Sequence, residues 1–268
     1  MDNRLKAVIF DWAGTVVDYG CFAPLQAFQS AFENRGVAIT AEEARAPMGL
    51  LKRDHIRSIL NMERVRTAWV ERFGAPWTEA DLEGLYADFE GRLMESLEVY
   101  TDPIPGVLEL VEQLRREGKK IGSTTGYTQA MMDVVAPAAK RKGYAPDFMV
   151  AADELKRGRP YPYMLFRNME ELDAFPPRAV MKVGDTVSDV REGNNAGVWT
   201  VAVLKGGSEL GLTQLEVESM NREELQARMD AVRVRFEEAG ANFVIESIDR
   251  LPEVIALVES GGGKEEKV

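Results

Sequence analysis

The residues with the clearest chemical potential are two aspartates, each of which directly follows an apolar stretch. Asp11 follows Ala7-Val8-Ile9-Phe10, and Asp185 ends a second apolar run over residues 179–185. Four consecutive apolar residues are typical of a strand that is buried on both faces, as in a parallel sheet. Ligands of such sheets bind outside the carboxyl ends of the strands. We therefore expect both carboxylates at one edge of a sheet, although Asp11 taken alone also fits a turn cap before Gly14.

A third aspartate strengthens the case for a bound cation. Asp189 lies four residues after Asp185, at the start of a helix predicted over residues 189–196. Clustered carboxylates repel one another unless a cation lies between them. Mg²⁺ typically binds one or two carboxylates, several waters and a substrate phosphate oxygen. The sequence therefore predicts a magnesium site, with a simple helix-terminal charge as the alternative for Asp189.

A phosphate-binding element is predicted where another strand, over residues 120–126, ends in Thr125 and Gly126. The hydroxyl group and the backbone N–H groups before the next helix, over residues 129–142, would form an anion site. The basic loop at residues 156–160 is expected to bring Arg159 to the same edge. The alternatives are that Thr125 only caps the helix and that Arg159 is a surface charge.

A lysine in a different part of the chain is a candidate nucleophile. Lys52 and His55 stand three residues apart on a helix predicted over residues 50–60, with Met48 and Ile59 on about the same face. Apolar surroundings lower the pKa of an amine and make it a nucleophile towards carbonyl groups. A protonated imine withdraws electrons, so a carbon could leave phosphorus as an enamine. The spacing alone leaves open a solvated lysine beside a hydrogen-bonded histidine.

Two kinds of patterning divide the chain. Strands and helices alternate over residues 1–20 and 101–260, which predicts an α/β core with a doubly wound parallel sheet, Rossmann-like in form. Residues 21–100 show only helical patterning, which predicts an inserted all-helical cap domain. Residues 102–106, with two prolines and a glycine, are the expected hinge between them. The glycine-rich and charged tail over residues 261–268 is expected to be disordered.

Composition narrows the class of protein. The 268 residues carry a formal net charge of −11, which disfavours nucleic acid and membrane surfaces as partners because both are polyanionic. Cys21 is the only cysteine, so no internal disulfide can form. Met1 to Arg4 show no apolar leader before the first strand. We expect a soluble cytoplasmic protein.

These motifs occur in the order found in the haloacid dehalogenase-like superfamily, which the chain resembles over nearly its whole length. The resembling segments are Asp11-Trp12-Ala13-Gly14-Thr15, the strand that ends in Thr125, Arg159-Pro160, and Gly184-Asp185-Thr186-Val187-Ser188-Asp189. The resemblance implies that Asp11 is a nucleophile that becomes an aspartyl-phosphate. It implies Mg²⁺ bound by Asp11, Asp185 and the carbonyl oxygen of Ala13, with support from Asp189. It also implies that Thr125 and Arg159 bind the phosphoryl group.

One departure from the superfamily pattern concerns the leaving group. Phosphatases of the superfamily usually carry a second aspartate two residues after the nucleophile, as the general acid for an alkoxide. Here that position is Ala13. Without the acid an ordinary phosphate ester would be a poor substrate, so another group must stabilise what leaves.

A closer resemblance, to the phosphonatase branch, supplies that group. It rests on Ala13, Cys21, Met48-Gly49, Lys52, His55 and Thr124-Thr125-Gly126-Tyr127. It implies that Lys52 forms a Schiff base with phosphonoacetaldehyde, that Asp11 takes the phosphoryl group, and that acetaldehyde and phosphate are released. His55 would shuttle protons around the imine, and Met48, Cys21 and Tyr127 would line the pocket. The resemblance also implies a homodimer joined through the caps.

Two other hypotheses remain open from the sequence. A phosphomonoesterase or phosphomutase of the same superfamily would use Lys52 only to bind an anionic substrate, and Ala13 counts against it. A non-catalytic Mg²⁺- or phosphate-binding regulator is the other. The intact set of Asp11, Thr125, Arg159, Asp185 and Asp189 counts against that.

Overall fold

Six parallel strands form the sheet that carries most of the predicted site. The computed structural model describes residues 4–261, and the strand order is β3-β2-β1-β4-β5-β6. The strands are β1 (Ala7–Phe10), β2 (Lys120–Thr124), β3 (Phe148–Val150), β4 (Val180–Gly184), β5 (Trp199–Val203) and β6 (Phe243–Ile245). This order is that of a doubly wound sheet whose direction of winding reverses beside β1. The predicted fold class is confirmed.

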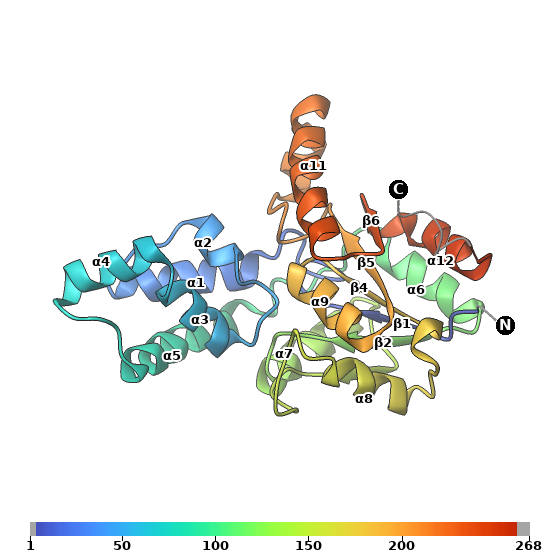
Figure 1. Ribbon diagram of the computed structural model, residues 1–268, viewed down its shortest axis with the longest axis horizontal. Helices are drawn as coiled ribbons and strands as arrows, with labels where there is room; N and C mark the ends of the chain where they lie inside the picture. The colour runs from blue at the N-terminus through green and yellow to red at the C-terminus, as the bar shows by residue number, and fades with distance from the viewer. Residues whose placement is uncertain (1–3, 262–268) are drawn as a thin grey trace.

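The apolar run of β1 is explained by helices that cover both faces of the sheet (Figure 1). Val8 and Phe10 pack into the cluster that includes α6, α7 and α12, whereas Ala7 and Ile9 face α8 and α9. The core helices are α6 (Val107–Arg116), α7 (Gln129–Arg141), α8 (Tyr163–Glu171), α9 (Val187–Ala196), α10 (Gln214–Ser219), α11 (Arg222–Glu238) and α12 (Leu251–Glu259). Short 3-10 turns lie at Pro177–Ala179 and Ile248–Arg250.

Five helices inserted after β1 form a group of their own, on the left of Figure 1. They are α1 (Phe22–Asn34), α2 (Ala41–Arg45), α3 (Lys52–Leu60), α4 (Glu63–Phe73) and α5 (Glu79–Ser96). Thr40 begins α2 with a capping box, in which its side chain and that of Glu43 each accept a backbone N–H of the other residue. Phe28 of α1 stacks on Phe89 of α5 with ring centroids 4.1 Å apart. We refer to these helices as the cap.

The two chain crossings between core and cap lie side by side. Val17 forms an antiparallel bridge with Pro103, and the backbone N–H of Ile104 donates to the carbonyl of Val16 at 2.9 Å. The segment predicted as the hinge is therefore one of two paired connections. Cap movement must be accommodated by both segments.

Two of the elements differ from the expectations, and one expectation falls on residues that the structure does not describe. The helix predicted from residue 50 begins at Lys52, because Leu51 is in an extended conformation. Helix α10 was not expected from the sequence, although Thr213 and Glu216 form a capping box at its start. The predicted tail lies outside the described residues except for Gly261. Between residues 4 and 261, no helix combines the length and the apolar character that a membrane span requires.

Candidate active site

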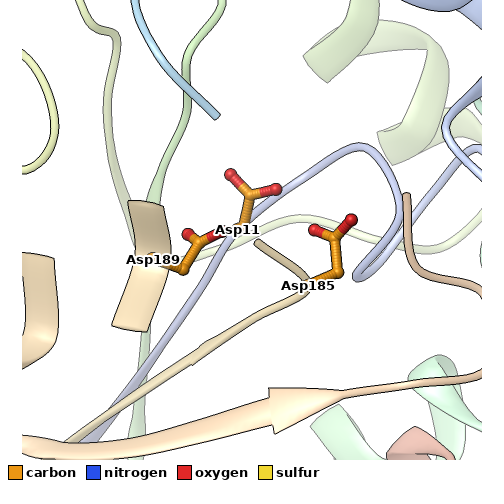
Figure 2. Close-up of side chains that lie close together, drawn as sticks. All are labelled: Asp11, Asp185 and Asp189. Atoms are coloured by element: carbon orange, nitrogen blue, oxygen red, sulfur yellow. The ribbon is translucent and has the colours of Figure 1, made fainter. Parts of the chain in front are cut away.

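Three aspartates meet at the carboxyl edge of the sheet, as predicted. Asp11 follows β1, Asp185 follows β4 and Asp189 lies in the first turn of α9, with one carboxyl oxygen from each within 4.8 Å of the others. Their carboxyl groups point to the same side in Figure 2, and all three residues are buried. The neighbouring positions of β1 and β4 in the sheet bring together residues that are more than 170 positions apart in the sequence.

The carboxylate of Asp185 is held from two sides. The hydroxyl group of Thr15 donates to Oδ1 at 2.9 Å, and the backbone N–H of Ser208 donates to Oδ2 at 2.7 Å. Gly14 has a φ of +88°, and a Cβ atom there would lie 2.3 Å from Oδ2. The glycine after Ala13 therefore allows both the turn and the close approach of Asp185.

The electrostatics of the cluster fit a divalent cation. Burial, together with the charges of Asp11 and Asp189, raises the pKa of Asp185 to about 8. Burial also raises the pKa of Asp11, and the charge of Arg159 opposes this effect. Each oxygen of Asp185 has a lone pair beyond its one hydrogen bond. A hard cation with oxygen ligands would remove the repulsion between Asp11 and Asp185, and the donor set suits Mg²⁺.

Asp189 differs from the other two aspartates because protein cations already neutralise it. Its Oδ1 lies 2.9 Å from Nζ of Lys182 and 3.1 Å from Nη1 of Arg159. Its side chain also forms the capping box of α9 with Thr186. Although burial opposes its charged form, Arg159 and Lys182 outweigh this effect and lower the pKa of Asp189. Asp189 is thus both a charge at the N-terminus of α9 and a member of the aspartate cluster.

Arg159 points at the predicted nucleophile. Its Nη2 donates to Oδ1 of Asp11 at 2.6 Å, and to the carbonyl and hydroxyl oxygens of Thr124 at 3.0 and 2.8 Å. Its side chain is 1% exposed, so the alternative of a surface charge is wrong. Burial favours the neutral guanidine, but the carboxylates of Asp11, Asp189 and Glu192 raise the pKa of Arg159. A fixed cation therefore faces the carboxylate that would carry a phosphoryl group.

The loop after β2 reaches the same edge, although Thr125 is not a helix cap. Its hydroxyl oxygen accepts the backbone N–H of Tyr127 at 3.0 Å, and it is Thr128 that caps α7. The alternative reading of Thr125 is wrong, and so is the expectation that it lies directly at a helix N-terminus. A Cβ atom at Gly126 would lie 2.9 Å from the carbonyl oxygen of Leu50 in the cap. Gly126 therefore lets core and cap approach closely.

Lys52 is a cap residue that faces this edge. It begins α3, is 3% exposed, and its Nζ lies 5.0 Å from the ring centroid of Tyr127 and 5.7 Å from that of Phe28. Burial lowers the pKa of Lys52, while Cys21 and Asp11 oppose this effect. The solvated-lysine alternative is wrong.

The surroundings of Lys52 also correct one prediction. Met48 lies in the turn before α3 and not on the same helix face as Lys52 and Ile59, because the helix starts only at Lys52. The apolar neighbours of the amine are aromatic rings from α1 and from the loop after β2.

His55 is fully buried one turn after Lys52. Its Nε2 bonds to the carbonyl oxygen of Ala44 at 2.8 Å, and its ring lies 3.9 Å from that of Phe28. Burial and the neighbouring Lys52 charge keep the pKa of His55 well below its usual value. Since a carbonyl accepts, Nε2 carries the proton, and Nδ1 has no hydrogen-bond partner among the described residues. Its proton-shuttle role stays a prediction.

A small cavity of about 20 Å³ lies between cap and core. Its core lining is Asp11, Ala13, Thr125, Gly126, Tyr127, Arg159 and Thr186, and its cap-side lining is Cys21, Met48, Gly49 and Lys52. Cys21 is buried, and burial raises the pKa of its thiol well above the usual value. The structure thus brings together the predicted nucleophile, amine and phosphate-binding residues around one cavity, which His55 does not line.

The sequence assigned no role to four buried residues of this network, although two of them lie within the motifs. Lys182 interrupts the apolar strand β4, Glu192 lies one turn after Asp189, Thr124 precedes Thr125, and Thr15 ends the first motif. A lysine inside an otherwise apolar strand was the one available signal. Its partners come from β2 and α9, which the sequence does not place beside it.

A comparison with known families decides the assignment. The model described as haloacid dehalogenase-like hydrolase matches residues 5–197. The chain belongs to this hydrolase family. A phosphonoacetaldehyde hydrolase of Bacillus cytotoxicus is 56% identical to the chain over 96% of this chain and 97% of its own length.

Two further proteins resemble the chain. A bifunctional phosphonoacetaldehyde hydrolase/aminoethylphosphonate transaminase of Clostridioides difficile is also 56% identical, and the chain spans 41% of its length. The crystal structure of a phosphonoacetaldehyde hydrolase-like protein from Oleispira antarctica superposes with a TM-score of 0.94 at 36% identity, covering 98% of this chain and 96% of that one. The chain is therefore a hydrolase of this family and is similar to relatives named phosphonoacetaldehyde hydrolase.

Proposed function

We propose that the chain hydrolyses the carbon–phosphorus bond of phosphonoacetaldehyde and releases acetaldehyde and phosphate. The observation that carries this proposal is that the buried amine of Lys52 and the carboxylate of Asp11 line the same cavity. One comes from the cap and the other from the core. The names of the relatives point to the same substrate.

The amine acts first in the proposed sequence. Burial favours the neutral form of Lys52, which attacks the aldehyde carbon and releases water to form an imine. Protonation of the imine nitrogen lets the imine accept the electron pair of the carbon–phosphorus bond when that bond breaks. The rings of Tyr127 and Phe28 lie within cation–π distance of Nζ and would stabilise this positive charge.

The carboxylate acts second. Asp11 attacks phosphorus, the carbon–phosphorus bond breaks, and its electron pair moves to the imine to give an enamine on Lys52. Protonation of the enamine carbon and hydrolysis of the resulting imine release acetaldehyde. Water then hydrolyses the aspartyl-phosphate and releases phosphate. Arg159 beside Asp11 is placed to bind the phosphoryl oxygens.

Magnesium is part of the proposal. Asp11, Asp185 and the carbonyl oxygen of Ala13 would hold it, and Asp189 would support the site through Thr186 and Lys182. When bound, the ion would neutralise charge on the nucleophile and on the phosphoryl oxygens. The protein's own residues supply the remaining chemistry.

Ala13 favours this reaction over ester hydrolysis. It lines the cavity at the position where a phosphatase of the superfamily would carry its general acid, and a methyl group cannot protonate an alkoxide. In carbon–phosphorus cleavage the imine accepts the electrons instead. Lys52 thus replaces the missing acid.

The proposal is tested by measuring phosphate and acetaldehyde from phosphonoacetaldehyde in the presence of Mg²⁺, with p-nitrophenyl phosphate as the ester comparison. We expect equal amounts of the two products, and inactivation when borohydride is added with the substrate. Release of phosphate that is insensitive to borohydride would favour the phosphomonoesterase hypothesis. Absence of turnover on both compounds would favour a binding protein.

A further inference from the structure

Glu192 is a buried carboxylate to which the proposed reaction gives no role. It lies on α9, one turn after Asp189, and is fully buried. Its Oε2 accepts the Nε–H of Arg159 at 3.0 Å and the hydroxyl group of Thr124 at 3.2 Å, and Nζ of Lys182 lies 3.6 Å away. Burying a charge is unfavourable unless it is paired. These contacts pair the buried charge of Glu192 with the cations Arg159 and Lys182.

The contact with Nε fixes the direction of the guanidinium group. The guanidinium is planar and its donors have a fixed relative geometry, so holding Nε determines where the two terminal nitrogens point. Nη2 points to Oδ1 of Asp11, 2.6 Å away. Nη1 lies 3.1 Å from Oδ1 of Asp189. Glu192 and Asp11 thus hold the guanidinium from different sides.

Thr124 and Lys182 complete the support. The hydroxyl and carbonyl oxygens of Thr124 both accept hydrogen bonds from Nη2 of Arg159. Nζ of Lys182 also donates to the hydroxyl oxygen of Thr124, at 2.8 Å. With these contacts Glu192 binds Arg159 directly and also through Thr124. Figure 2 shows the neighbouring carboxylates of Asp11 and Asp189. The guanidinium donates a hydrogen bond to the first and forms an ion pair with the second.

We propose that Glu192 is a positioning residue, which aims the Nη2 edge of Arg159 at the phosphoryl group transferred to Asp11. Glu192 touches neither substrate nor nucleophile in this role. The inference rests on the proposed function, because it requires a phosphoryl group at Asp11.

The charge of Glu192 and its contact with Arg159 predict opposite effects on phosphate binding when Glu192 is removed. A negative charge near the site repels an anion, so by charge alone the removal of Glu192 would tighten phosphate binding. If Glu192 positions Arg159, its removal releases the guanidinium and weakens phosphate binding. Gln keeps an acceptor for Nε without the charge, whereas Met has similar length and no acceptor.

The experiment measures inhibition by inorganic phosphate and the kcat and KM of the Mg²⁺-loaded enzyme. For Glu192→Met we expect the phosphate inhibition constant to rise about tenfold, as for the loss of one oriented charge-assisted hydrogen bond. For Glu192→Gln we expect a change of less than about threefold. Phosphate binding by Glu192→Met as tight as, or tighter than, that of Glu192→Gln would overturn the proposal.

A matched control separates positioning from stability. Glu259 also pairs with a buried lysine, Lys119 at 3.2 Å, at the other edge of the sheet. We expect Glu259→Met to lower the melting temperature and leave phosphate inhibition unchanged. Should Glu192→Met fail to fold, Glu192→Asp replaces it, because its shorter side chain withdraws the acceptor from Nε while keeping the charge. Unaltered phosphate inhibition in Glu192→Asp would then overturn the proposal.

Failure of this inference is distinguishable from failure of the proposed function. Acetaldehyde lacks a phosphoryl group, so its borohydride trapping on Lys52 depends on the amine alone. We expect trapping to be equal in wild type and Glu192→Met. Trapping in wild type with phosphate inhibition unaffected in Glu192→Met would reject only the role of Glu192. Absence of trapping in wild type would reject the imine mechanism.

Discussion

The proposed reaction needs both Lys52 and Asp11 deprotonated at the same pH, and burial favours this for the amine but opposes it for the carboxyl group. Burial lowers the pKa of Lys52, which favours the neutral nucleophile. Burial raises the pKa of Asp11, which disfavours the charged nucleophile, and the nearby cations Arg159 and Lys182 oppose this. The guanidinium beside Asp11 is therefore needed to keep the carboxylate reactive while the amine remains neutral.

Replacing the amine tests its covalent role. Lys52→Arg keeps a cation but does not readily form an imine, so we expect carbon–phosphorus cleavage to fall by about 10⁴-fold or more, as when a catalytic nucleophile is removed. Phosphate release from phosphonoacetaldehyde measures the loss. Arg53→Ala is the control, because Arg53 is on the same helix but forms surface ion pairs with Glu79 and Glu83. Turnover by Lys52→Arg close to wild type would end the imine proposal.

His55 gives a pH dependence of stability whose sign is fixed by its burial. Its pKa in the folded chain lies well below the usual 6.5, so below that pH the unfolded chain binds a proton that the folded chain does not. Its contribution to stability is therefore present above pH 6.5 and is lost as the pH falls, with a limiting slope of about 1.4 kcal/mol per pH unit.

The measurement compares the free energy of unfolding of wild type and His55→Gln between pH 7 and 5. Gln can still donate to the carbonyl of Ala44 but does not titrate. We expect the wild-type curve to fall more steeply. Asp18, whose pKa burial raises to about 6, contributes with the opposite sign in both proteins and cancels. Parallel curves would show that His55 is protonated in the folded state.

At the scale of elements, a tight turn before α3 forms the contact that closes the cap on the core. The carbonyl oxygen of Met48 accepts the hydroxyl group of Ser188 at 3.2 Å. Gly49 has a φ of +85°, and a Cβ atom there would lie 2.5 Å from Oγ1 of Thr186. The turn therefore touches the loop that carries Asp185, and its position determines where Lys52 begins α3.

Gly49→Ala tests this contact. The added methyl group meets Thr186, so we expect a lower kcat and a higher KM because the cap cannot close fully. Gly74→Ala is the matched control, since Gly74 also has a positive φ (+74°) but a Cβ atom there meets nothing within 4 Å. Both variants should lose about 1 kcal/mol of stability from the backbone alone. Equal kinetics for the two variants would contradict the closing role of the turn.

The elements that sequence patterns predicted well are those with local signals. β1 and β4 combine apolar runs with a terminal aspartate, and both strands and their shared edge were predicted. The start of α3 was misplaced because Leu51 provides no side-chain cap that would mark it. Thr125 and Thr128 both resemble helix caps in the sequence, and only the backbone geometry selects Thr128.

The support behind Arg159 could not have been predicted in the same way. Glu192 and Lys182 acquire their roles from contacts with Thr124 and Arg159, which lie 33 to 68 positions away along the chain. No residue spacing within a short stretch of the sequence indicates such contacts. The sequence therefore predicted the residues at the ends of strands better than those that hold them.

At the scale of the whole molecule, the buried charges of the site do not balance. Four buried carboxyl groups (Asp11, Asp185, Asp189 and Glu192) face two cations, Arg159 and Lys182, which leaves two negative charges when all four are ionised. The buried Lys52 adds a charge only when it is protonated. A divalent cation would balance the set, so its binding is linked to the stability of the fold.

Metal removal should therefore destabilise the protein. We expect Mg²⁺ at millimolar concentration to raise the melting temperature above that in chelator by several degrees, and chelator to abolish phosphate release. Borohydride trapping of acetaldehyde should persist in chelator because Lys52 acts without the ion. Asp185→Asn should lose the thermal shift. An equal shift in Asp185→Asn and wild type would place the ion elsewhere.

The division into core and cap would let one molecule hold the two proposed nucleophiles near one substrate. Asp11 is fixed to the sheet and Lys52 to the cap. The cavity between them has a volume of about 20 Å³. This is too small for a phosphonate aldehyde, because a cavity needs about 10–15 Å³ to hold a single water molecule. The cap must open for substrate to enter. The paired connections at Val17 and Pro103 are where the two parts join.

The measurement that tests the account most directly locates the covalent adduct of the amine. The Mg²⁺-loaded enzyme is mixed with phosphonoacetaldehyde, reduced with borohydride, digested, and analysed by peptide mass spectrometry. We predict a two-carbon ethyl group on Lys52 and on no other lysine, in proportion to the activity lost. Full inactivation with Lys52 unmodified, or unimpaired activity with Lys52 fully modified, would contradict the central claim that this amine carries the substrate during carbon–phosphorus cleavage.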